Sequence, residues 1–515
     1  MIILYHNETK VVALRNADSF EMEKHSHLSI ASFMALLANE FPDEILVWCH
    51  LSLKEQLNIS EIEQLFHHKK LLFSYNPFCS SYLDKNIGYI DESPFVKVNA
   101  TVTFPTWQMS SWVGCIHSVV FLALKNEIPC EKNFDYFLCS LAKLSMPKGL
   151  LCYSEPKLLK QYPHTINLTK KNTFILFRFV KQHYKTRWVF LLLLNFLLYE
   201  RRFPVFPMII SLFYKNRNSN TINLDGIIVQ SSRAVIAAGT IDVIIPTIGR
   251  SAYLYDVLKD FANQVKLPRT IIIVEQNPLE GSTTELGYIT TEKWPFDIQH
   301  IFTHQSGACN ARNSALNQTQ SEWVFLADDD NRFTPNLLVD VFKLIQQFGS
   351  PVVTVSYPQK NEIKRNTKVI QWPTFGAGNS IVKRDLLRKV KFNVALEFGY
   401  GEDGDFGMQL RNTGTDVLYL PEPEILHLKA PIGGFRTKPV LRWQNDGIQP
   451  KPSPTIMLYK ILHTTVEQRL GYKTILFFKY YQYQNIKNPF RYFKAFNKQW
   501  KRSIYWANEL RANQK

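Results

Sequence analysis

Apolar residues follow two patterns along this chain, and both are clearest between residues 240 and 440. Short runs rich in branched apolar residues predict strands at 241–245, 270–274, 300–302 and 323–327. Apolar residues at helical spacing follow the first of these strands and also the last. Strands that alternate with helices predict a mainly parallel sheet whose ligands lie at the carboxyl ends of the strands.

The last of these strands ends in a cluster of acids. Trp323–Ala327 has the character of a strand buried on both faces, and Asp328, Asp329 and Asp330 follow it directly. Thr334 is predicted to cap the next helix, with Pro335 at its first position. Clustered carboxylates on an accessible turn suit a hard divalent cation that bridges phosphates. A solvated acidic turn with a capping role is the alternative.

The first 160 residues predict a separate mixed α/β domain. Strands are expected at 44–48 and 71–75, and helices at 30–41 and 134–144. The segment 104–117 is expected to lead into a further helix that ends near Leu124. This part has no glycine-rich phosphate loop and no pair of carboxylates. His50, after the first of these strands, is interpreted as a structural histidine. Asp135 has no acidic neighbour and is not expected to act as a general base.

Residues 161–235 form a helical and linker segment with two apolar runs. The run 188–199 has 12 residues between basic flanks, whereas a spanning helix needs about 20. The run 203–214 is interrupted by two prolines. A buried helix and an interfacial helix lying on anionic lipid both remain open. Residues 218–239, rich in Asn, Ser, Gly and Ala, are the predicted linker.

The C-terminal region, 441–515, is basic and aromatic. Residues 456–515 hold twelve Lys or Arg and two Glu, within a chain whose net charge is +16. A helical tail of this kind suits a membrane interface or packing on the preceding domain. Because no nucleic-acid fold signature accompanies the basic patch, nucleic acid is not favoured as a partner.

Length and composition set broad limits. A chain of 515 residues predicts two or three domains, and the positive excess suits anionic partners without choosing among them. The seven cysteines lack C-x-x-C or zinc spacing, and polar residues soon follow Met1 where a signal peptide would be apolar. We therefore expect a cytoplasmic protein, with a peripheral position at the inner face of the cytoplasmic membrane as a further interpretation.

Five more motifs surround the acidic turn. Arg250 and the backbone of the motif at 244–250 can face a nucleotide, and Arg312 in the motif at 307–313 can pair with phosphate. The small residues of the motif at 375–380 let a sugar approach the backbone closely. Glu275, at the end of the second strand, can accept hydrogen bonds from a base. In order, the motifs are I-I-P-T-I-G-R (244–250), G-A-C-N-A-R-N (307–313), F-G-A-G-N-S (375–380), G-Y-G-E-D-G-D-F (399–406) and I-L-H-L-K-A-P-I-G-G-F-R (425–436).

This ordered set resembles the family 2 glycosyltransferases over residues 240–436. The G-E-D-x-D run and the later His are also similar to the β-1,4-galactosyltransferase C-terminal module. The resemblance implies an α/β architecture of the GT-A type, a nucleotide-sugar-binding mixed sheet flanked by helices. The N-terminal α/β domain faintly resembles the second half of such a fold without its carboxylates. A degenerate, non-catalytic copy is the interpretation.

The resemblance also implies roles for single residues. Asp328 and Asp330, with His427, would bind Mn²⁺ or Mg²⁺, and Asp403 would be the catalytic base beside Glu402, which holds a sugar. The residues implied for nucleotide-sugar binding are Pro246, Thr247, Gly249, Arg250, Glu275, Arg312, Asp328, Asp329, Gly378 and Asn379. The second strand ends in V-E-Q-N where the family has a pair of Asp.

The implied reaction is an inverting, metal-dependent transfer from a nucleotide-diphosphate sugar, expected to be a UDP-sugar. The acceptor would be a glycan or a lipid-linked molecule in surface polysaccharide synthesis. No Q-x-x-R-W motif of processive polymerases is present, which favours single additions. A non-catalytic protein that binds sugar or nucleotide, and a sugar-nucleotide nucleotidyltransferase, are the alternatives.

Overall fold

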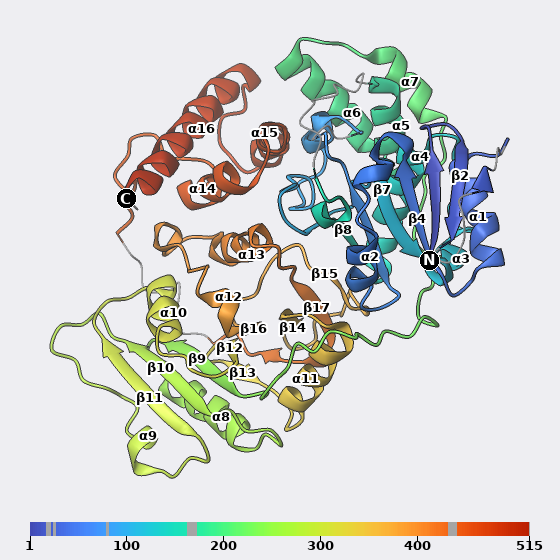
Figure 1. The fold of residues 1–515 in the computed structure, drawn as a ribbon. Helices are drawn as coiled ribbons and strands as arrows, with labels where there is room; N and C mark the ends of the chain where they lie inside the picture. The colour runs from blue at the N-terminus through green and yellow to red at the C-terminus, as the bar shows by residue number, and fades with distance from the viewer. Residues whose placement is uncertain (17–21, 24–26, 79–81, 162–171, 431–439, 514–515) are drawn as a thin grey trace. The chain divides into compact units, whose positions relative to one another are not determined.

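The structure is a computed structural model that separates into two compact units, drawn in Figure 1. Unit 1 comprises Met1–Ser232 and Thr464–Leu476, and unit 2 comprises Arg233–His463 and Phe477–Lys515. The boundary at residue 232 lies inside the predicted linker, and nearly all of the segment expected at 161–235 belongs to unit 1. Two predicted stretches, 162–171 and the end of the last motif at 431–436, lie outside the described residues. The described residues are 1–16, 22–23, 27–78, 82–161, 172–430 and 440–513.

The sheet of unit 2 has the mixed architecture expected of a GT-A fold. Within the described residues it holds eight strands in the order β11-β10-β9-β12-β16-β14-β17-β15 (Figure 1). Strands β11, β10, β9 and β12 run parallel to one another, whereas β16 is antiparallel to both β12 and β14. The strands are β9 (Ile241–Thr247), β10 (Thr270–Gln276), β11 (Asp297–Thr303), β12 (Trp323–Ala327), β14 (Val352–Ser356), β15 (Ile370–Gln371), β16 (Asn379–Lys383) and β17 (Leu418–Glu424).

Helices cover both faces of this sheet, which explains why its central strands are apolar throughout. Phe325 of β12 packs on Phe261 of α8, and Trp323 packs on Phe342 of α11. The alternate residues Val324 and Leu326 point into the other apolar layer, which includes side chains of α10 and α13. The helices of this part are α8 (Ser251–Ala262), α9 (Tyr288–Thr291), α10 (Ala308–Leu316), α11 (Leu337–Phe348), α12 (Arg384–Leu387) and α13 (Glu402–Asn412).

Two predicted element ends in unit 2 are wrong. Helix α11 begins at Leu337, so Thr334 is not its cap and Pro335 is not its first residue. The reason is a tertiary contact: the side chain of Gln264 accepts from the amide of Leu338 at 3.1 Å, at the start of the helix. Strand β11 is longer than the three residues 300–302 that were predicted, because the partly exposed residues of this edge strand hide its apolar signal.

The sheet of unit 1 repeats the strand order of unit 2. Its described strands follow the order β3-β2-β1-β4-β7-β5-β8-β6. From β1 to β6 every neighbouring pair has the same direction as the corresponding pair from β9 to β15. The strands are β1 (Ile2–His6), β2 (Val11–Asn16), β3 (Met22–Glu23), β4 (Ile45–His50), β5 (Leu71–Tyr75), β6 (Phe104–Pro105), β7 (Val113–His117) and β8 (Leu151–Ser154).

The two sheets differ at one edge. In unit 2, helix α8 connects β9 to the parallel strand β10, and β11 extends the sheet further. In unit 1, β2 returns antiparallel to β1 after a short turn. Unit 1 therefore keeps the half of the pattern that follows β12 in unit 2 and replaces the parallel edge by a hairpin.

The helices of unit 1 include three that form the segment after residue 172. The apolar run expected at 188–199 becomes α6 followed by a π-helical turn at Phe196–Glu200, and the second run becomes α7. Both α6 and α7 contact α5. The helices are α1 (Ile30–Glu40), α2 (Ile59–Leu65), α3 (Ser118–Leu124), α4 (Phe134–Ser145), α5 (Thr173–His183), α6 (Arg187–Asn195) and α7 (Val205–Leu212).

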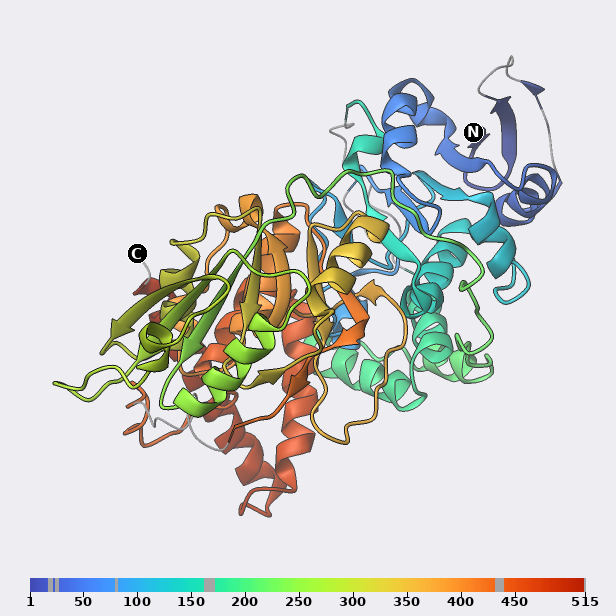
Figure 2. The same cartoon turned by 90° about the horizontal axis from the view of Figure 1, so that it is seen from below.

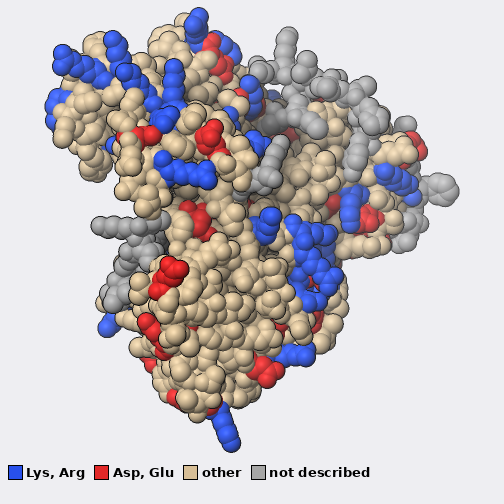
Figure 3. Space-filling model, turned by 90° about the vertical axis from the view of Figure 1, so that its left-hand side faces the viewer, with Lys and Arg blue, Asp and Glu red and all other residues tan. Residues whose placement is uncertain are grey.

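The basic tail is helical, as expected. It forms α14 (Pro454–His463), α15 (Val466–Tyr481) and α16 (Pro489–Ala512), and α14 packs against α16 (Figure 2). Tyr492, Phe496 and Trp500 are the buried aromatic residues of α16. Figure 3 shows Lys and Arg side chains gathered at the top of the face where these helices lie. Among the described residues, no helix combines the length and the apolar character that crossing a membrane requires.

Gly114→Ala is predicted to destabilise unit 1. A Cβ at this position in β7 would lie 2.2 Å from the ring of Trp48 and 2.5 Å from the carbonyl oxygen of Phe73. Overpacking of a tight core costs about 1–3 kcal/mol, and we expect a loss near the upper end in the free energy of unfolding in urea. Gly226→Ala is the control, because nothing lies within 4 Å of that added carbon. Equal stability of the two variants would contradict the prediction.

Candidate active site

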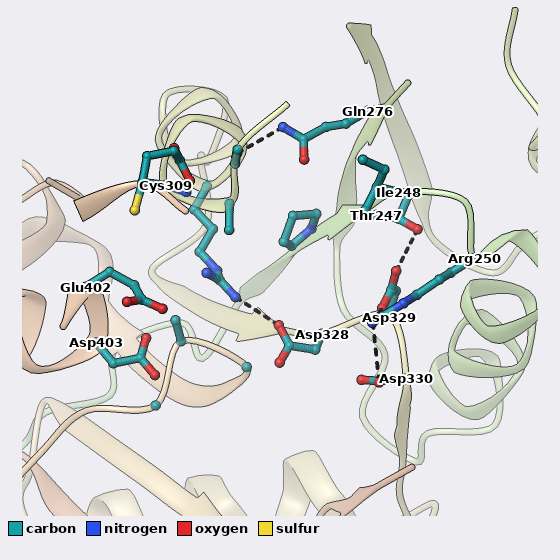
Figure 4. A pocket seen from close by; sticks show the side chains of 18 of the residues that line it. Thr247, Ile248, Arg250, Gln276, Cys309, Asp328, Asp329, Asp330, Glu402 and Asp403 are labelled. Atoms are coloured by element: carbon teal, nitrogen blue, oxygen red, sulfur yellow. Dashed lines mark hydrogen bonds and ion pairs between the residues drawn. The ribbon is translucent and has the colours of Figure 1, made fainter. Parts of the chain in front are cut away.

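A cavity of about 620 Å³ opens in unit 2 where β9 and β12 end (Figure 4). Gly249 has a φ of 59° in the turn after β9 and does not line the cavity itself. Figure 4 shows Glu402 and Asp403 on one side and the three acids of the turn on the other. The predicted residues that line the cavity are Pro246, Thr247, Arg250, Arg312, Asp328, Asp329, Asp330, Gly378, Asn379, Glu402, Asp403 and His427.

Asp329 joins the acidic turn to the end of β9. Its carboxylate accepts hydrogen bonds from the hydroxyl of Thr247 and from Nη1 of Arg250, each at 2.7 Å. Burial raises the pKa of Asp329 to about 6, although Arg250 acts in the opposite direction. The parallel pairing of β9 with β12 therefore brings a guanidinium beside the acids, as the sequence predicts. That guanidinium contacts carboxylates in this structure, where a nucleotide was expected.

Asp330 is held by the chain segment that carries His427. Strand β13 (Asn331–Arg332) pairs with β18 (Leu426–His427), so that Asn331 lies opposite His427. The amide of Ala430 donates to Oδ2 of Asp330 at 2.8 Å. Nε2 of His427 lies 3.6 Å from Oδ1 of Asp330, and this carboxylate raises the pKa of His427. The predicted pair of Asp330 and His427 is therefore brought together by a short antiparallel ladder.

Asp328 faces Arg312 and the small-residue loop. Nη2 of Arg312 lies 2.9 Å from Oδ1 of Asp328, and the hydroxyl of Tyr357 lies 3.3 Å from Oδ2. A Cβ on Gly378 would stand 2.0 Å from Oδ2 of Asp328, so glycine is needed for this approach. The ring of Tyr357 also stacks on His427, with centroids 4.5 Å apart. Arg312, predicted to pair with phosphate, pairs with an acid in this structure.

Asp403 is the second residue of α13 and faces the same cavity. It accepts a hydrogen bond from the amide of Ala377 in the small-residue loop. Burial raises the pKa of Asp403 to about 7, and the nearby carboxylates of Glu402 and Asp328 act in the same direction, whereas Arg312 lowers it. A carboxylate with a pKa near neutrality in a cavity has the properties of a general base.

Two further acids lie outside the cavity, Glu275 at the end of β10 and Asp405 in the G-E-D-x-D run. Glu275 does not line the cavity, because its carboxylate is occupied by Thr284, the amide of Glu285 and His300. The adjacent Gln276 lines the cavity instead, so the structure does not bring Glu275 to a bound base. Asp405 is buried against His463, with 2.7 Å between Oδ1 and Nε2, and serves the packing of α13 on α14.

Glu397 is a lining residue that sequence reasoning missed. Its carboxylate oxygens accept from the amides of Cys309 and Asn310, at 3.0 and 2.9 Å, where α10 begins. The motif that begins α10 was predicted to pair with phosphate through Arg312, and a side chain of the protein occupies its first amides here. A single Glu in a loop carries no sequence signal. Tyr357 and Lys429 also line the cavity and were missed for the same reason.

Unit 1 has counterparts to parts of this site, but its strand β4 is not followed by an acidic turn. The last residue of β4 that pairs with β7 is Cys49, opposite Val113, and the last of β12 that pairs with β16 is Ala327, opposite Asn379. The residues that follow them, His50 and Asp328, are therefore counterparts. His50 caps the turn that follows it, and its ring lies 4.6 Å from that of Trp112.

Asp135 is the counterpart of Asp403. It is the second residue of α4 and accepts from the amide of Ser111 at 2.7 Å, as Asp403 accepts from Ala377. Ser111 and Ala377 hold matching positions, each two residues before the paired residue of β7 or β16. Unit 1 therefore has a carboxylate at the position of Asp403 without the acidic turn.

The donor set at the acidic turn fits a divalent cation in its chemistry. Within the described residues, no group of three or more His, Cys, Asp or Glu side chains is arranged to hold a metal ion. However, Oδ1 of Asp330 is buried without a hydrogen-bond partner, and His427 approaches it only to 3.6 Å. A buried carboxylate oxygen without a donor is favourable only when a cation or a proton satisfies it.

Comparison with known proteins gives two kinds of match. The family profile described as "Glycosyl transferase family 2" matches residues 242–400. A search of curated proteins finds no match. Among solved structures, S. aureus TarS 1–349 shares 18% identity with a TM-score of 0.30, covering 37% of this chain and 60% of that one. Full TarS shares 16% with a TM-score of 0.32, covering 46% of this chain and 42% of that one.

The mannosyltransferase PcManGT from Pyrobaculum calidifontis, in complex with GDP-Man and Mn²⁺, shares 19% identity with a TM-score of 0.31. That match covers 38% of this chain and 58% of the mannosyltransferase. The chain thus spans less than two thirds of these three solved chains.

The family match begins at the second residue of β9 and ends just before α13. It contains the acidic turn, both arginines of the cavity and the small-residue loop. The strand order around it is that of the mixed sheet predicted for a GT-A fold. Residues 242–400 therefore form a family 2 glycosyltransferase domain.

Proposed function

We propose that this protein transfers a sugar from a nucleotide-diphosphate donor, expected to be a UDP-sugar, to an acceptor hydroxyl with inversion at the anomeric carbon. The observation that carries the proposal is that Asp403, with a pKa of about 7, shares one cavity with Asp328 and Asp330. A base and a cluster of cation ligands in one cavity are what an inverting transfer from a diphosphate needs.

In the proposed step, the acceptor hydroxyl oxygen attacks the anomeric carbon and gives its proton to Asp403. The bond from that carbon to the diphosphate oxygen breaks, and its electron pair leaves with the nucleotide diphosphate. The amide of Ala377 orients the carboxylate of Asp403. Glu402, next to it at the start of α13, holds sugar hydroxyls in this proposal. One in-line displacement inverts the anomeric configuration.

Asp328, Asp330 and His427 would hold the divalent cation, Mn²⁺ or Mg²⁺. When bound, such a cation supplies positive charge that neutralises the departing diphosphate. The protein's own contribution is to orient the acids and to place positive charge beside them. Arg312 does this for Asp328, and Arg250 does it for Asp329. His427 and the amide of Ala430 lower the pKa of Asp330, although burial opposes them.

The proposed acceptor is a glycan or a lipid-linked molecule in surface polysaccharide synthesis, and the enzyme would work at the cytoplasmic face of the membrane. Unit 1 is proposed to be a non-catalytic copy of the GT-A pattern. Its matching strand order supports a common plan, and His50 in the place of Asp328 leaves it without the cation ligands.

Asp403→Asn is predicted to lower sugar transfer about 1,000-fold, because general-base catalysis typically contributes 10²–10⁴. Release of nucleotide from a panel of sugar donors, with acceptor present, measures the effect. Asp135→Asn, the matched change in unit 1, should leave turnover within about twofold. Transfer that survives in a folded Asp403→Asn protein would remove Asp403 from its role and favour the sugar-binding or nucleotidyltransferase alternatives.

The pH dependence of transfer should report the same group. Asp403 is ionised above its pKa of about 7, so kcat/KM should rise with pH through that value. Because Arg312 lowers the pKa of Asp403, Arg312→Met should move this rise to higher pH. Arg388→Met, at an exposed position, is the control. A rise that stays at the same pH in both variants would contradict the assignment.

Stability should show the opposite trend for Asp403. Its pKa is 3.8 in the unfolded reference and about 7 in the fold, so the folded chain binds the extra proton between these values. Its contribution to stability is present at low pH and is lost as pH rises from about 4 to about 7. Asp403→Asn should therefore unfold at a higher temperature than the parent protein at pH 8 but not at pH 4.

Removal of divalent cations should abolish transfer, and Mn²⁺ or Mg²⁺ should restore it. Asp330→Asn should weaken Mn²⁺ binding at least about tenfold, because it removes one charged ligand. Electron paramagnetic resonance of free Mn²⁺ measures binding without an activity readout. Asp340→Asn, an exposed acid on α11, should bind Mn²⁺ as the parent protein does. Full activity in chelator would exclude the metal from the proposal.

A further inference from the structure

Helix α7 of unit 1 exposes an apolar stripe. Phe206, Ile209, Ile210 and Phe213 recur at the spacing of one helix face, and their exposed fractions are 76, 44, 45 and 84%. The opposite face contributes Ser211, which is 1% exposed. A surface helix of a globular protein normally exposes a polar face, whereas α7 is apolar on both sides, because Met208 and Leu212 of its inner face pack on the core.

The exposed apolar surface continues onto the neighbouring segments. Helix α6 contacts α7, and the π-helical turn after α6 leads into the chain just before α7. Soluble monomers rarely expose a large contiguous apolar patch without a binding role. We call this surface the α7 face, and its exposed members are Phe190, Leu197, Leu198, Phe203, Phe206, Ile209, Ile210, Phe213 and Tyr214.

The charges beside the α7 face have one sign. Residues 185–217 contain six Lys or Arg and one acid, Glu200. The carboxylate of Glu200 is engaged by the hydroxyl of Tyr89 at 3.3 Å and by Arg202 at 3.4 Å. Arg201 and Arg202 are exposed immediately before Phe203, and Lys215 is exposed immediately after Tyr214. Cationic side chains therefore lie at both ends of the apolar stripe.

We propose that the α7 face docks on an anionic lipid surface, with the aromatic and aliphatic side chains among the acyl chains and the basic residues at the phosphates. Apolar residues on one face with Lys and Arg beside them are what an interfacial helix presents to a bilayer. The inference rests on the membrane-bound acceptor of the proposed function, because it names the surface through which the enzyme reaches that acceptor.

Charge separates this occupant from a second copy of the chain. Two α7 faces brought together would place Arg201, Arg202 and Lys215 of each copy against the same residues of the other. Like charges at an interface oppose association, whereas anionic headgroups neutralise them. The proposal favours the interfacial alternative for residues 203–214, because Phe206, Ile209 and Phe213 are exposed while the inner side of the helix packs on the core.

The test is co-sedimentation of the 515-residue protein with vesicles of phosphatidylcholine, alone or mixed with phosphatidylglycerol. The parent protein should bind the mixed vesicles and release them as salt is raised. The triple variant Phe206→Ser, Ile210→Ser, Phe213→Ser should lose at least about tenfold in partitioning. Arg201→Gln with Arg202→Gln should lose the preference for phosphatidylglycerol.

Matched variants separate this face from general stickiness and from the basic tail. Leu28→Ser, Leu36→Ser and Leu51→Ser remove three other exposed apolar side chains of unit 1 and should bind as the parent protein does. The double variant Phe490→Ser, Phe493→Ser removes two exposed aromatic side chains of α16 and should leave most vesicle binding intact. Hydrogen exchange should show protection over residues 203–214 when mixed vesicles are added.

Several outcomes would overturn the inference. Vesicle binding that the tail variant loses and the α7 variant keeps would place the lipid contact on α16. A dimer in analytical ultracentrifugation without lipid, made monomeric by the α7 variant, would make a second copy the occupant. Hydrolysis of the sugar donor in the absence of vesicles is measured in parallel. If the parent protein does not hydrolyse the donor, the proposed function is contradicted. If it hydrolyses the donor but does not bind vesicles, only the docking surface is contradicted.

Discussion

The candidate site depends on holding several carboxylates in one partly closed cavity. Like charges at short range in a low dielectric cannot all remain ionised unless cations or donors compensate them. Two guanidinium groups from different elements do so here, Arg250 from the turn after β9 and Arg312 from α10. The order of strands in the sheet sets their positions, because β9 lies directly beside β12. On the other side of the cavity, burial raises the pKa of Asp403 to about 7, and the carboxylates of Glu402 and Asp328 act in the same direction.

The sequence predicted the elements that carry the chemistry because their signals are local. The five apolar residues before Asp328 can be recognised as a buried strand within a few positions, and the loop before β16 can be recognised by its small residues. The same holds for the carboxylates at the start of α13. Most of the predicted site residues meet in one cavity for this reason.

What the sequence could not predict depends on contacts between distant positions. Glu397 reaches the amides of α10 from 88 positions downstream, and Gln264 replaces Thr334 at the start of α11 from 74 positions upstream of the amide that it binds. Glu275 had the right place in the chain, but its side chain is satisfied by Thr284 and His300 outside the cavity. Spacing along one dimension says where a strand ends and not which way a side chain turns there.

The shared order of the two sheets bears on how the chain reaches its native state. Newly synthesised, this polypeptide offers two sets of strands whose order and directions from β1 to β6 and from β9 to β15 coincide. Exchange of equivalent strands between repeated halves is a characteristic error of such proteins. The hairpin of β1 and β2 opposes it, because it is a local pairing within residues 2–16 and gives unit 1 an edge that the described strands of unit 2 do not share. We expect this early, local pairing to commit the first half of the molecule before its later counterpart leaves the ribosome.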